Sequence, residues 1–460
     1  MRLLYILVFL PFLSLSQEKF TLNGYITDKE SGESLIGATV YINELNAGTV
    51  TNAYGFYSIT LDEGTYSLDF RYIGYVSMSR SIDLNSNQKV DIELEGDDIQ
   101  LENIVISDQA EDFNISSIEM STAKLDMSKI SEIPTFLGEN DIIKAIQLLP
   151  GVSSVGEGAS GFNVRGGSVG QNLVLLDEAP VYNSSHLLGF LSVFNPDAVK
   201  DLKLYKGGIP SRFGGRLSSI LDIRMKDGNN KKTVVSGGIG SIFSRFTLES
   251  PIKKDKSSFI LALRRSYADI LFSPFLKNSG VFNDGSALNF YDITAKANFD
   301  LDPKNTIFVS SYIGRDVFMF DERQGFNWGN RTGTLRWNHL FNDRLFSNFT
   351  LIYSNYDYQL AFGSDDMNKF EWDSKVETYN FKPELTYFIN ANNELSLGAE
   401  VIRYRFEPAN AVGVSEGEIS DITLPSKYAF EGSFYIGNEQ KFSNLTLSYG
   451  ARYSIYSYYG

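Results

Sequence analysis

The sequence contains no cysteine and only two histidines, His186 and His339, among 460 residues. The lack of cysteine excludes disulfide scaffolds, thiolate metal sites and cysteine nucleophiles, and two histidines are a poor supply for a metal centre. Basic residues are also scarce, with 41 Lys and Arg against 56 Asp and Glu, and the net charge of −15 argues against nucleic-acid binding. We therefore expect no cofactor, no metal and no nucleic-acid partner.

Aromatic residues are abundant and unevenly placed. The first 232 residues contain 21 of them, and the last 228 contain 42, including all three tryptophans. The length alone suggests two to four domains. The imbalance divides the chain into two chemically different halves.

Residues 1–16 have the composition of a secretory signal peptide, with a basic Arg2, an apolar run from Leu3 to Leu13 and small residues before Gln17. The run is interrupted by Pro11 and is shorter than the ~20 residues that span a bilayer as a helix. No other apolar run reaches ~18 residues. The sequence therefore predicts an exported chain whose mature part has no transmembrane helix.

Residues 19–95 consist of short β-branched or aromatic runs separated by glycines, which is typical of a β-sandwich. The informative phrases are Gly24-Tyr-Ile-Thr-Asp28, Leu35-Ile-Gly37-Ala-Thr-Val40, Gly48-Thr-Val-Thr-Asn-Ala-Tyr-Gly55 and Gly64-Thr-Tyr66. They resemble the carboxypeptidase-regulatory-like domain, which implies a seven-stranded, transthyretin-like sandwich. Asn52 stands where that family usually has Asp, a change that we expect only to trim a turn hydrogen bond. The module has no nucleophile–base pair, which favours a structural or docking role.

Residues 96–125 form an acidic, polar linker with one β-prone island. The island consists of Asn103, Ile104, Val105, Ile106 and Ser107. Such a segment is either a stray fragment or a strand that waits for a partner's sheet edge, where backbone hydrogen bonds would supply the affinity.

Residues 126–228 have a mixed α/β pattern. Asn140 is the expected N-cap of a helix that ends at Pro150, and its apolar face is Ile142, Ile143, Ile146 and Leu149. Glycine turns follow, but none has the spacing of a phosphate-binding loop. The sequence therefore predicts no nucleotide site here.

Five phrases in residues 138–226 resemble the plug domain of TonB-dependent outer-membrane receptors. They are Ala145-Ile-Gln-Leu-Leu-Pro-Gly-Val152, Phe162-Asn-Val-Arg-Gly-Gly167, Val174-Leu-Leu-Asp-Glu-Ala-Pro-Val181, Leu204-Tyr-Lys-Gly-Gly-Ile-Pro210 and Arg212-Phe-Gly-Gly-Arg216. The motif residues that we single out are Arg165, Gly166, Gly167, Asp177, Arg212, Gly214, Gly215 and Arg216. The resemblance implies that residues 103–107 are a TonB-box-like segment, which pairs with a TonB-type inner-membrane energy transducer. The closing phrase departs from the polysaccharide-importing SusC-like subgroup, so we do not assign the chain to it.

Residues 232–460 alternate between apolar and polar side chains over runs of about 9 to 12 residues, the length of a tilted membrane-spanning strand. Short turns alternate with longer predicted loops, such as 317–330, 360–370 and 408–426, which is typical of outer-membrane barrels. A soluble sandwich shares the alternation alone. The predicted fold is mainly β: an N-terminal β-sandwich, an α/β plug and part of a transmembrane antiparallel β-barrel. We count ten strands, or eleven if 234–250 is a hairpin, of an expected ~22.

If the apolar faces contact lipid, then Lys296, Glu384, Glu431 and Arg452 should face the lumen. The three motif arginines either pair with lumen carboxylates or are solvated turn residues, and both interpretations stay open. We expect Asp177 and Glu178 to be solvated or hydrogen-bonding turn residues.

The favoured function is energised import of a scarce extracellular solute across the outer membrane, without enzymatic activity. The expected partners are the energy transducer, outer-membrane lipid, a solute of the siderophore, oligosaccharide or peptide class, and, as a further candidate, a surface lipoprotein. The N-terminal domain would lie in the periplasm, and roughly 250 further barrel residues should follow Gly460. The alternative is a surface-exposed β-rich adhesion protein. A secreted hydrolase using Ser184, Ser185 and His186 has no supporting motif, and the solute-contacting residues are unknown, with loops carrying Phe326, Trp328 and Phe362 as candidates.

Overall fold

The computed structural model describes residues 18–97, 121–127, 130, 133, 139–156, 161–271, 286–321, 323–365, 368–415, 418–442 and 445–459. The predicted signal peptide, 1–16, and the TonB-box-like segment, 103–107, lie outside the described residues. Across the described ranges, no helix is long and apolar enough to cross a membrane.

The N-terminal domain is a sandwich of two sheets around one apolar core. One sheet contains β4 (Phe56–Asp62), β1 (Lys19–Asp28), β7 (Gln88–Lys89) and β8 (Ile92–Leu94), and the other runs β3 (Ala47–Val50), β2 (Thr39–Ile42), β5 (Gly64–Arg71) and β6 (Met78–Leu84). β7 and β8 keep a single parallel register along β1, which pairs Leu22 with Gln88 and Ile26 with Ile92. They are therefore one interrupted strand, and the sandwich has the seven strands that the resemblance implied.

The turn before β4 keeps the hydrogen bonds that Asn52 was expected to weaken. Its side-chain Oδ1 accepts from the backbone N–H groups of Tyr54, at 2.9 Å, and Phe56, at 3.1 Å. An Asn oxygen accepts from these amides as an Asp oxygen would. Gly55 follows with φ of +75°, where a Cβ would lie 2.9 Å from the carbonyl oxygen of Ile26.

Residues 121–225, which we call the middle domain, are built on a five-stranded mixed sheet in the order β13-β12-β17-β16-β9. The strands are β9 (Thr122–Asp126), β12 (Asn172–Leu176), β13 (Ala179–Pro180), β16 (Val199–Tyr205) and β17 (Ser219–Met225), and two small hairpins add β10 (Val152–Ser154), β11 (Phe162–Val164), β14 (Ser185–His186) and β15 (Leu191–Ser192). β9 begins four residues before the domain boundary expected from the sequence.

The helix of the middle domain is α3 (Ile142–Gln147), and its N-cap corrects the sequence prediction. Asp141, not Asn140, is the cap, because its Oδ1 accepts from the backbone N–H of Lys144 at 2.8 Å. A carboxylate is also the better partner for the positive end of the helix. The expected apolar face packs into the domain core, with Ile142, Ile143 and Ile146 buried.

Residues 234–459 form one antiparallel sheet, which we call the wall. Its strands are β18 (Val234–Ile239), β19 (Phe243–Lys253), β20 (Ser257–Ser266), β21 (Ala287–Asp302), β22 (Asn305–Met319), β23 (Gly325–Asn342), β24 (Leu345–Asp365), β25 (Asn368–Asn390), β26 (Asn393–Ser415), β27 (Glu418–Thr423), β28 (Lys427–Phe442) and β29 (Leu445–Tyr459). β18 and β19 are the hairpin that the higher strand count required, and β27 pairs only with β26 beside the main path of eleven strands.

The wall strands are longer than the sequence predicted. β24, β25 and β26 contain 21, 23 and 23 residues, so the loops expected at 360–370 and 408–426 are largely strand. The ladder continues because cross-strand pairs persist through these residues, such as Phe362 opposite Phe370 and Val412 opposite Asp421. The expected loop at 317–330 is likewise mostly β22 and β23.

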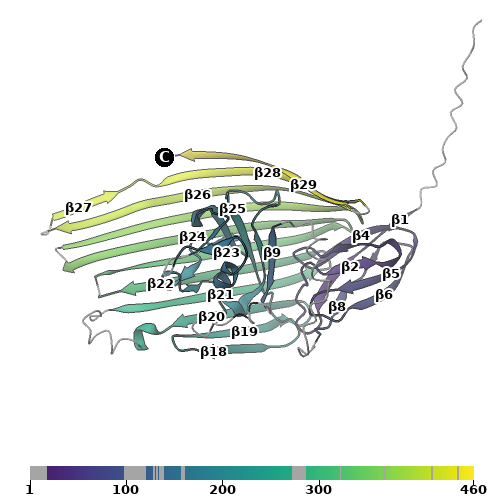
Figure 1. The fold of residues 1–460 in the computed structure, drawn as a ribbon, viewed down its shortest axis with the longest axis horizontal. Helices are drawn as coiled ribbons and strands as arrows, with labels where there is room; N and C mark the ends of the chain where they lie inside the picture. The colour runs from purple at the N-terminus through teal and green to yellow at the C-terminus, as the bar shows by residue number, and fades with distance from the viewer. Residues whose placement is uncertain are drawn as a thin grey trace, which may run out of the picture.

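The wall is curved, and the other two parts are placed relative to its concave face (Figure 1). The middle domain lies against this face, and the N-terminal domain lies at the end where short turns join the strands (Figure 1). The opposite face exposes the predicted apolar set. Its members include Ile293, Val309, Ile313, Leu335, Trp337, Leu351, Phe381, Leu397, Val401, Phe430, Phe434 and Ile436.

Candidate functional site

Asp177 and Glu178 form the two-residue turn between β12 and β13. Both have positive φ, 47° and 72°, as a type I′ hairpin turn requires. Residues other than glycine are uncommon there and each costs about 1 kcal/mol or more, so surrounding contacts must hold the turn. Both side chains are buried, which rules out the solvated interpretation.

Glu178 lies among three cations. Its carboxylate is 3.1 Å from Arg224 Nη1 on β17, 3.3 Å from Arg336 Nη2 on β23 and 3.7 Å from Lys382 Nζ on β25. Burial alone would raise the pKa of Glu178, but Lys382, Arg336 and Arg224 outweigh it and hold the pKa well below its usual range. This carboxylate is therefore ionised and joins the middle domain to two strands of the wall.

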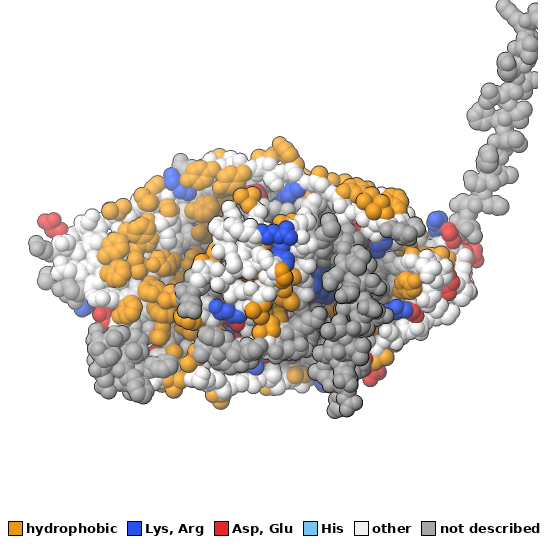
Figure 2. Space-filling model, in the orientation of Figure 1, with side chains coloured by type: hydrophobic (Ala, Val, Ile, Leu, Met, Phe, Trp, Pro, Cys, Tyr) orange, Lys and Arg blue, Asp and Glu red, His pale blue; other side chains and the backbone are white. Residues whose placement is uncertain are grey.

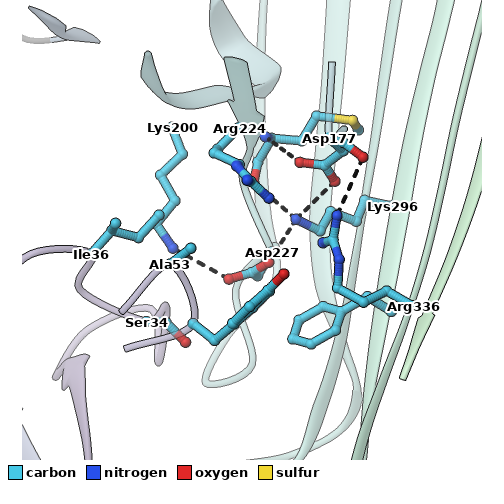
Figure 3. A pocket seen from close by; sticks show the side chains of 12 residues that line it. Ser34, Ile36, Ala53, Asp177, Lys200, Arg224, Asp227, Lys296 and Arg336 are labelled. Carbon is cyan, nitrogen blue, oxygen red and sulfur yellow. Dashed lines mark hydrogen bonds and ion pairs between the residues drawn. The ribbon is translucent and has the colours of Figure 1, made fainter. Parts of the chain in front are cut away.

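Asp177 makes a second connection to the wall (Figure 3). Its Oδ2 lies 3.0 Å from Lys296 Nζ on β21, and its Oδ1 accepts from the backbone N–H of Met225 at 2.9 Å. Lys296 also reaches Asp227 at 2.9 Å, and Asp227 pairs with Lys200 at 3.2 Å. A cavity of 20 Å³ beside these groups has room for about one water molecule.

His186 is the centre of a second buried cluster. Its Nδ1 lies 2.6 Å from Asp316 Oδ2, and its Nε2 lies 2.7 Å from Asp292 Oδ1. Burial would lower the pKa of His186, but the two carboxylates raise it to about 9. The imidazole is therefore protonated near neutral pH. Because both nitrogens are committed to carboxylates, His186 in this arrangement cannot be the general base for Ser184 or Ser185.

Arg264 on β20 completes this cluster. It binds Asp292 Oδ2 through Nη2 at 2.6 Å, Glu139 Oε1 through Nη1 at 2.7 Å and the carbonyl of Ser192 at 2.7 Å. The middle domain thus contacts the wall through two buried ion clusters, and in each cluster acidic and basic groups from the two parts lie together. Buried pairs of this kind are weak evidence for stability, but removing one partner costs about 3–5 kcal/mol. They are suited to fixing one position of a domain.

The three motif arginines make other contacts. Arg165 donates to Ser121 Oγ at 2.8 Å, Arg212 donates to Tyr205 at 3.4 Å and stacks on Phe213, and Arg216 donates to the Gly215 carbonyl at 2.9 Å. Among the described residues, none of them has an ion pair with a wall carboxylate within 4 Å.

The motif glycines are explained by close approach and turn geometry. A Cβ on Gly167 would lie 2.3 Å from Ser218 Oγ, and one on Gly214 would lie 2.5 Å from Arg452 Nε. Gly166 and Gly215 have φ of +80° and +76°. Gly167 and Gly214 thus let the loops pass close to neighbouring side chains, and Gly166 and Gly215 allow the left-handed backbone of the turns.

The four wall residues expected to face the lumen all lie on the concave face. Lys296 contacts Asp177, and Arg452 Nη1 donates to the carbonyl of Arg212 at 3.2 Å. Glu384 accepts from Tyr435 at 2.8 Å, and Glu431 accepts from Tyr404 at 3.2 Å. The contacts of Glu178 and His186 with the wall were not predicted from the sequence. The two-residue turn at Glu178 and the scarcity of histidine were signals that could have pointed to them.

Beyond the middle domain, one apolar row crosses the concave face at a single register. Leu288, Phe318, Phe326, Leu360, Trp372 and Ala411 are successive cross-strand partners from β21 to β26. Figure 2 shows hydrophobic side chains gathered over the wall to the left of the middle domain. Phe318, Phe326 and Trp328 stack nearly parallel, with centroids 5.3–5.7 Å apart. In the described part of the chain, the buried indole N–H of Trp328 has no hydrogen-bond partner.

Family comparisons agree with both resemblances. Residues 22–106 match the CarboxypepD_reg-like domain, and residues 117–219 match the TonB-dependent Receptor Plug Domain. The chain carries a TonB-dependent receptor plug domain. From here on, the middle domain is called the plug. The first match reaches residue 106 and so takes in most of the TonB-box-like segment. No curated protein sequence matches the chain.

Solved structures show the same fold. The siderophore receptor PirA of Acinetobacter baumannii is 16% identical with a TM-score of 0.56, covering 74% of this chain and 57% of its own. The ferric enterobactin receptor PfeA of Pseudomonas aeruginosa is 15% identical with a TM-score of 0.54, covering 75% and 58%. The ferric citrate transporter FecA is 13% identical with a TM-score of 0.55, covering 75% and 57%. The chain thus spans less than two thirds of their length, and the predicted architecture of sandwich, plug and barrel-type sheet is confirmed.

Proposed function

We propose that the protein is an outer-membrane receptor that imports an extracellular solute with energy from the inner membrane. The observation that carries the proposal is the plug, fixed against the concave face of the wall by Glu178 and His186. A plug held by buried ion pairs blocks a passage and can be released when those pairs are broken. An adhesion protein has no use for such a unit.

The outward face of the wall supports a membrane location. Its exposed side chains are apolar on successive strands, as with Val309, Leu335, Leu351, Phe381 and Phe434. A contiguous apolar surface of this kind is unfavourable in water and matches the lipid-facing band of a barrel. The N-terminal domain would then lie on the periplasmic side, where the wall has its short turns.

The apolar row supports a solute with an apolar or aromatic part. A water-filled lumen is normally polar. Three apolar side chains that are cross-strand neighbours on this face, Phe326, Leu360 and Trp372, therefore indicate an apolar binding partner. The three similar structures are named for siderophores, ferric enterobactin and ferric citrate, and we propose an iron chelate as the first solute class to test.

In this mechanism, solute binding above the plug exposes the TonB-box-like segment, and the energy transducer pairs with it as an added strand and pulls. Backbone pairing tolerates varied side chains, which suits the segment from Asn103 to Ser107. Proline there removes backbone donors and blocks the pairing.

The experiment is uptake of ⁵⁵Fe-enterobactin and ⁵⁵Fe-citrate by cells that depend on this protein. The double variant Ile104→Pro and Ile106→Pro should lose uptake at least tenfold. The matched control, Glu111→Pro and Phe113→Pro, has the same spacing in the same linker and should retain it. Equal uptake by both variants would remove strand addition at this segment. Energy-independent uptake in the unmodified protein would contradict the proposed function.

A further inference from the structure

The N-terminal domain is bonded to the turns at one end of the wall. Ser58 Oγ donates to the carbonyl of Asp343 at 2.7 Å, and Asn87 Nδ2 donates to its carboxylate at 2.9 Å. Asp343 lies in the turn between β23 and β24. Lys441, at the end of β28, donates to the carbonyl of Gly48 at 3.2 Å. The contacts therefore reach turns separated by several strands.

An aromatic cluster seals the same contact. Phe56 of the N-terminal domain lies 5.4 Å from Phe346 and 5.7 Å from Phe388, measured between ring centroids. Leu340 packs in the same cluster, and all four side chains are buried. Buried aromatic pairs dominate contact energies. The domain is thus docked on the wall rather than tethered beside it.

Tyr54 extends from this contact into the gap between wall and plug. Its ring stacks on Phe346 at 5.6 Å and lies 5.4 Å from the guanidinium carbon of Arg336. Its hydroxyl donates to Glu178 Oε1 at 3.3 Å. One side chain of the N-terminal domain therefore contacts both the wall and the plug carboxylate that anchors to it. The adjoining cavity of 20 Å³, lined also by Ala53 (Figure 3), is too small for any solute larger than water.

A second set of bonds joins the domain to the segment between plug and wall. Glu33 Oε1 accepts from the backbone N–H groups of Asp227, at 2.7 Å, and Gly228, at 3.3 Å. Lys231 pairs with Glu93 at 2.7 Å. The N-terminal domain is thus also attached to the segment that leads from the plug into the first strand of the wall.

We infer that the N-terminal domain is the closing element at the periplasmic end of the receptor, and that the Tyr54 turn is its latch on the plug. This inference rests on the proposed function. The linker that carries residues 103–107 joins Asp97 of this domain to Ser121 of the plug, so a pull on it acts on both at once. The solute leaves only after Tyr54 withdraws and the domain lifts from Asp343.

The absence of cysteine makes this testable by cross-linking. Asn87→Cys with Asp343→Cys places two thiols across the docked contact, and a short, reducible bis-thiol reagent joins them. The control pair, Thr65→Cys with Asp83→Cys, joins two exposed groups 3.3 Å apart within the N-terminal domain. With ⁵⁵Fe-enterobactin and ⁵⁵Fe-citrate as probes, uptake should fall at least tenfold in the first pair only and return on reduction. Full uptake in the cross-linked first pair would overturn the inference.

A second measurement needs no transport. Leu340→Cys places a thiol under Phe56, and a membrane-impermeant maleimide supplied to the periplasm reports its exposure. In resting cells, Tyr54→Ala should speed labelling several-fold, while Tyr54→Phe, which keeps the ring, should have a smaller effect. Labelling equally fast with and without Tyr54 would overturn the inference even if uptake is energised. Slow labelling released by Tyr54→Ala, without any energised uptake, would instead remove the proposed function and leave the closing contact.

Discussion

The imidazole Nδ1 of His186 lies 2.6 Å from Oδ2 of Asp316, so a histidine of the plug is bound to a carboxylate of the wall. The side-chain contact is reinforced next to it, because the backbone N–H of Leu187 donates to the other oxygen of Asp316 at 2.8 Å. The carboxylate holds the plug by a charged bond and by a backbone bond. Asp292 on the other side makes the histidine a bridge between two wall strands.

This relationship predicts that the plug is held less tightly in alkaline solution. The folded pKa of His186 is about 9, against 6.5 unperturbed, so its contribution is complete below about pH 6.5 and is lost as pH rises through 9. The shift corresponds to about 3 kcal/mol. The hydrogen-exchange protection factor of the Leu187 amide, corrected for intrinsic rates, should fall over this range. In His186→Gln the fall should be absent, and a fall that persists there would assign it to another group.

Removal of the Glu178 carboxylate should lower the free energy of unfolding more than removal of an exposed ion pair does. Glu178→Ala leaves Arg224, Arg336 and Lys382 without their shared anion. We expect the free energy of unfolding, measured with guanidinium chloride in detergent, to fall by about 3–5 kcal/mol. The double variant with Lys382→Met should lose less than the two single variants added together.

The control for this cycle is the exposed pair Lys369–Glu371 at 3.4 Å. Lys369→Met should change the free energy of unfolding by no more than about 0.5 kcal/mol. If Glu178→Ala proves as mild as Lys369→Met, the ion cluster is not what fixes the plug.

Gly24, in the first phrase that resembled the carboxypeptidase-regulatory-like domain, should tolerate no side chain. A Cβ there would lie 1.9 Å from the backbone carbonyl oxygen of Val90, between β7 and β8. Gly24→Ala must displace that edge strand, and we expect a loss of about 2 kcal/mol or more in the full chain. Gly96→Ala is the control, since no heavy atom lies within 4 Å of its Cβ position. Similar thermal unfolding of both variants would contradict this reading of the motif.

The facing of the wall residues was predictable, and the plug contacts were not. Strand alternation has a period of 2, so once the apolar set is assigned to lipid, Lys296 and Arg452 must face inward. The ends of the strands were misplaced because β24 and β25 keep pairing through residues that the sequence assigned to a loop. Residue type there no longer marks a change from strand to loop.

Asp177 and Lys296 are 119 positions apart in the sequence, and their contact depends on how the plug packs against the wall. Lys296 finds Asp177 only because β12 ends opposite β21, a relation that neither segment contains by itself. The motif arginines were the plausible partners by charge, yet Arg212 lies on Phe213. The plug instead offers Asp177 and Glu178 to cations of the wall, and its protonated His186 to carboxylates of the wall. The N-terminal domain was recognisable from its phrases, but its docking through Tyr54 was not, because contacts between domains leave no periodic pattern.

The three tryptophans allow a last prediction, because they divide between the two faces of the wall. Trp328 and Trp372 lie on the concave face, and Trp337 lies on the outward face with 42% of its surface exposed. If the apolar row binds an iron chelate, ferric enterobactin should quench the emission of the first two, because the iron complex lies beside their rings. Trp337→Phe should leave that quenching intact, and Trp328→Phe with Trp372→Phe should abolish it.

Brominated lipid should produce the opposite pattern. Reconstituted into vesicles of brominated phosphatidylcholine, the protein should lose emission from Trp337, since an outward residue at this position contacts acyl chains. The double variant that lacks Trp328 and Trp372 should then be quenched by lipid and not by the chelate. Quenching of Trp337 by the chelate would place the solute on the wrong face of the wall, and insensitivity to brominated lipid would remove this strand from the membrane.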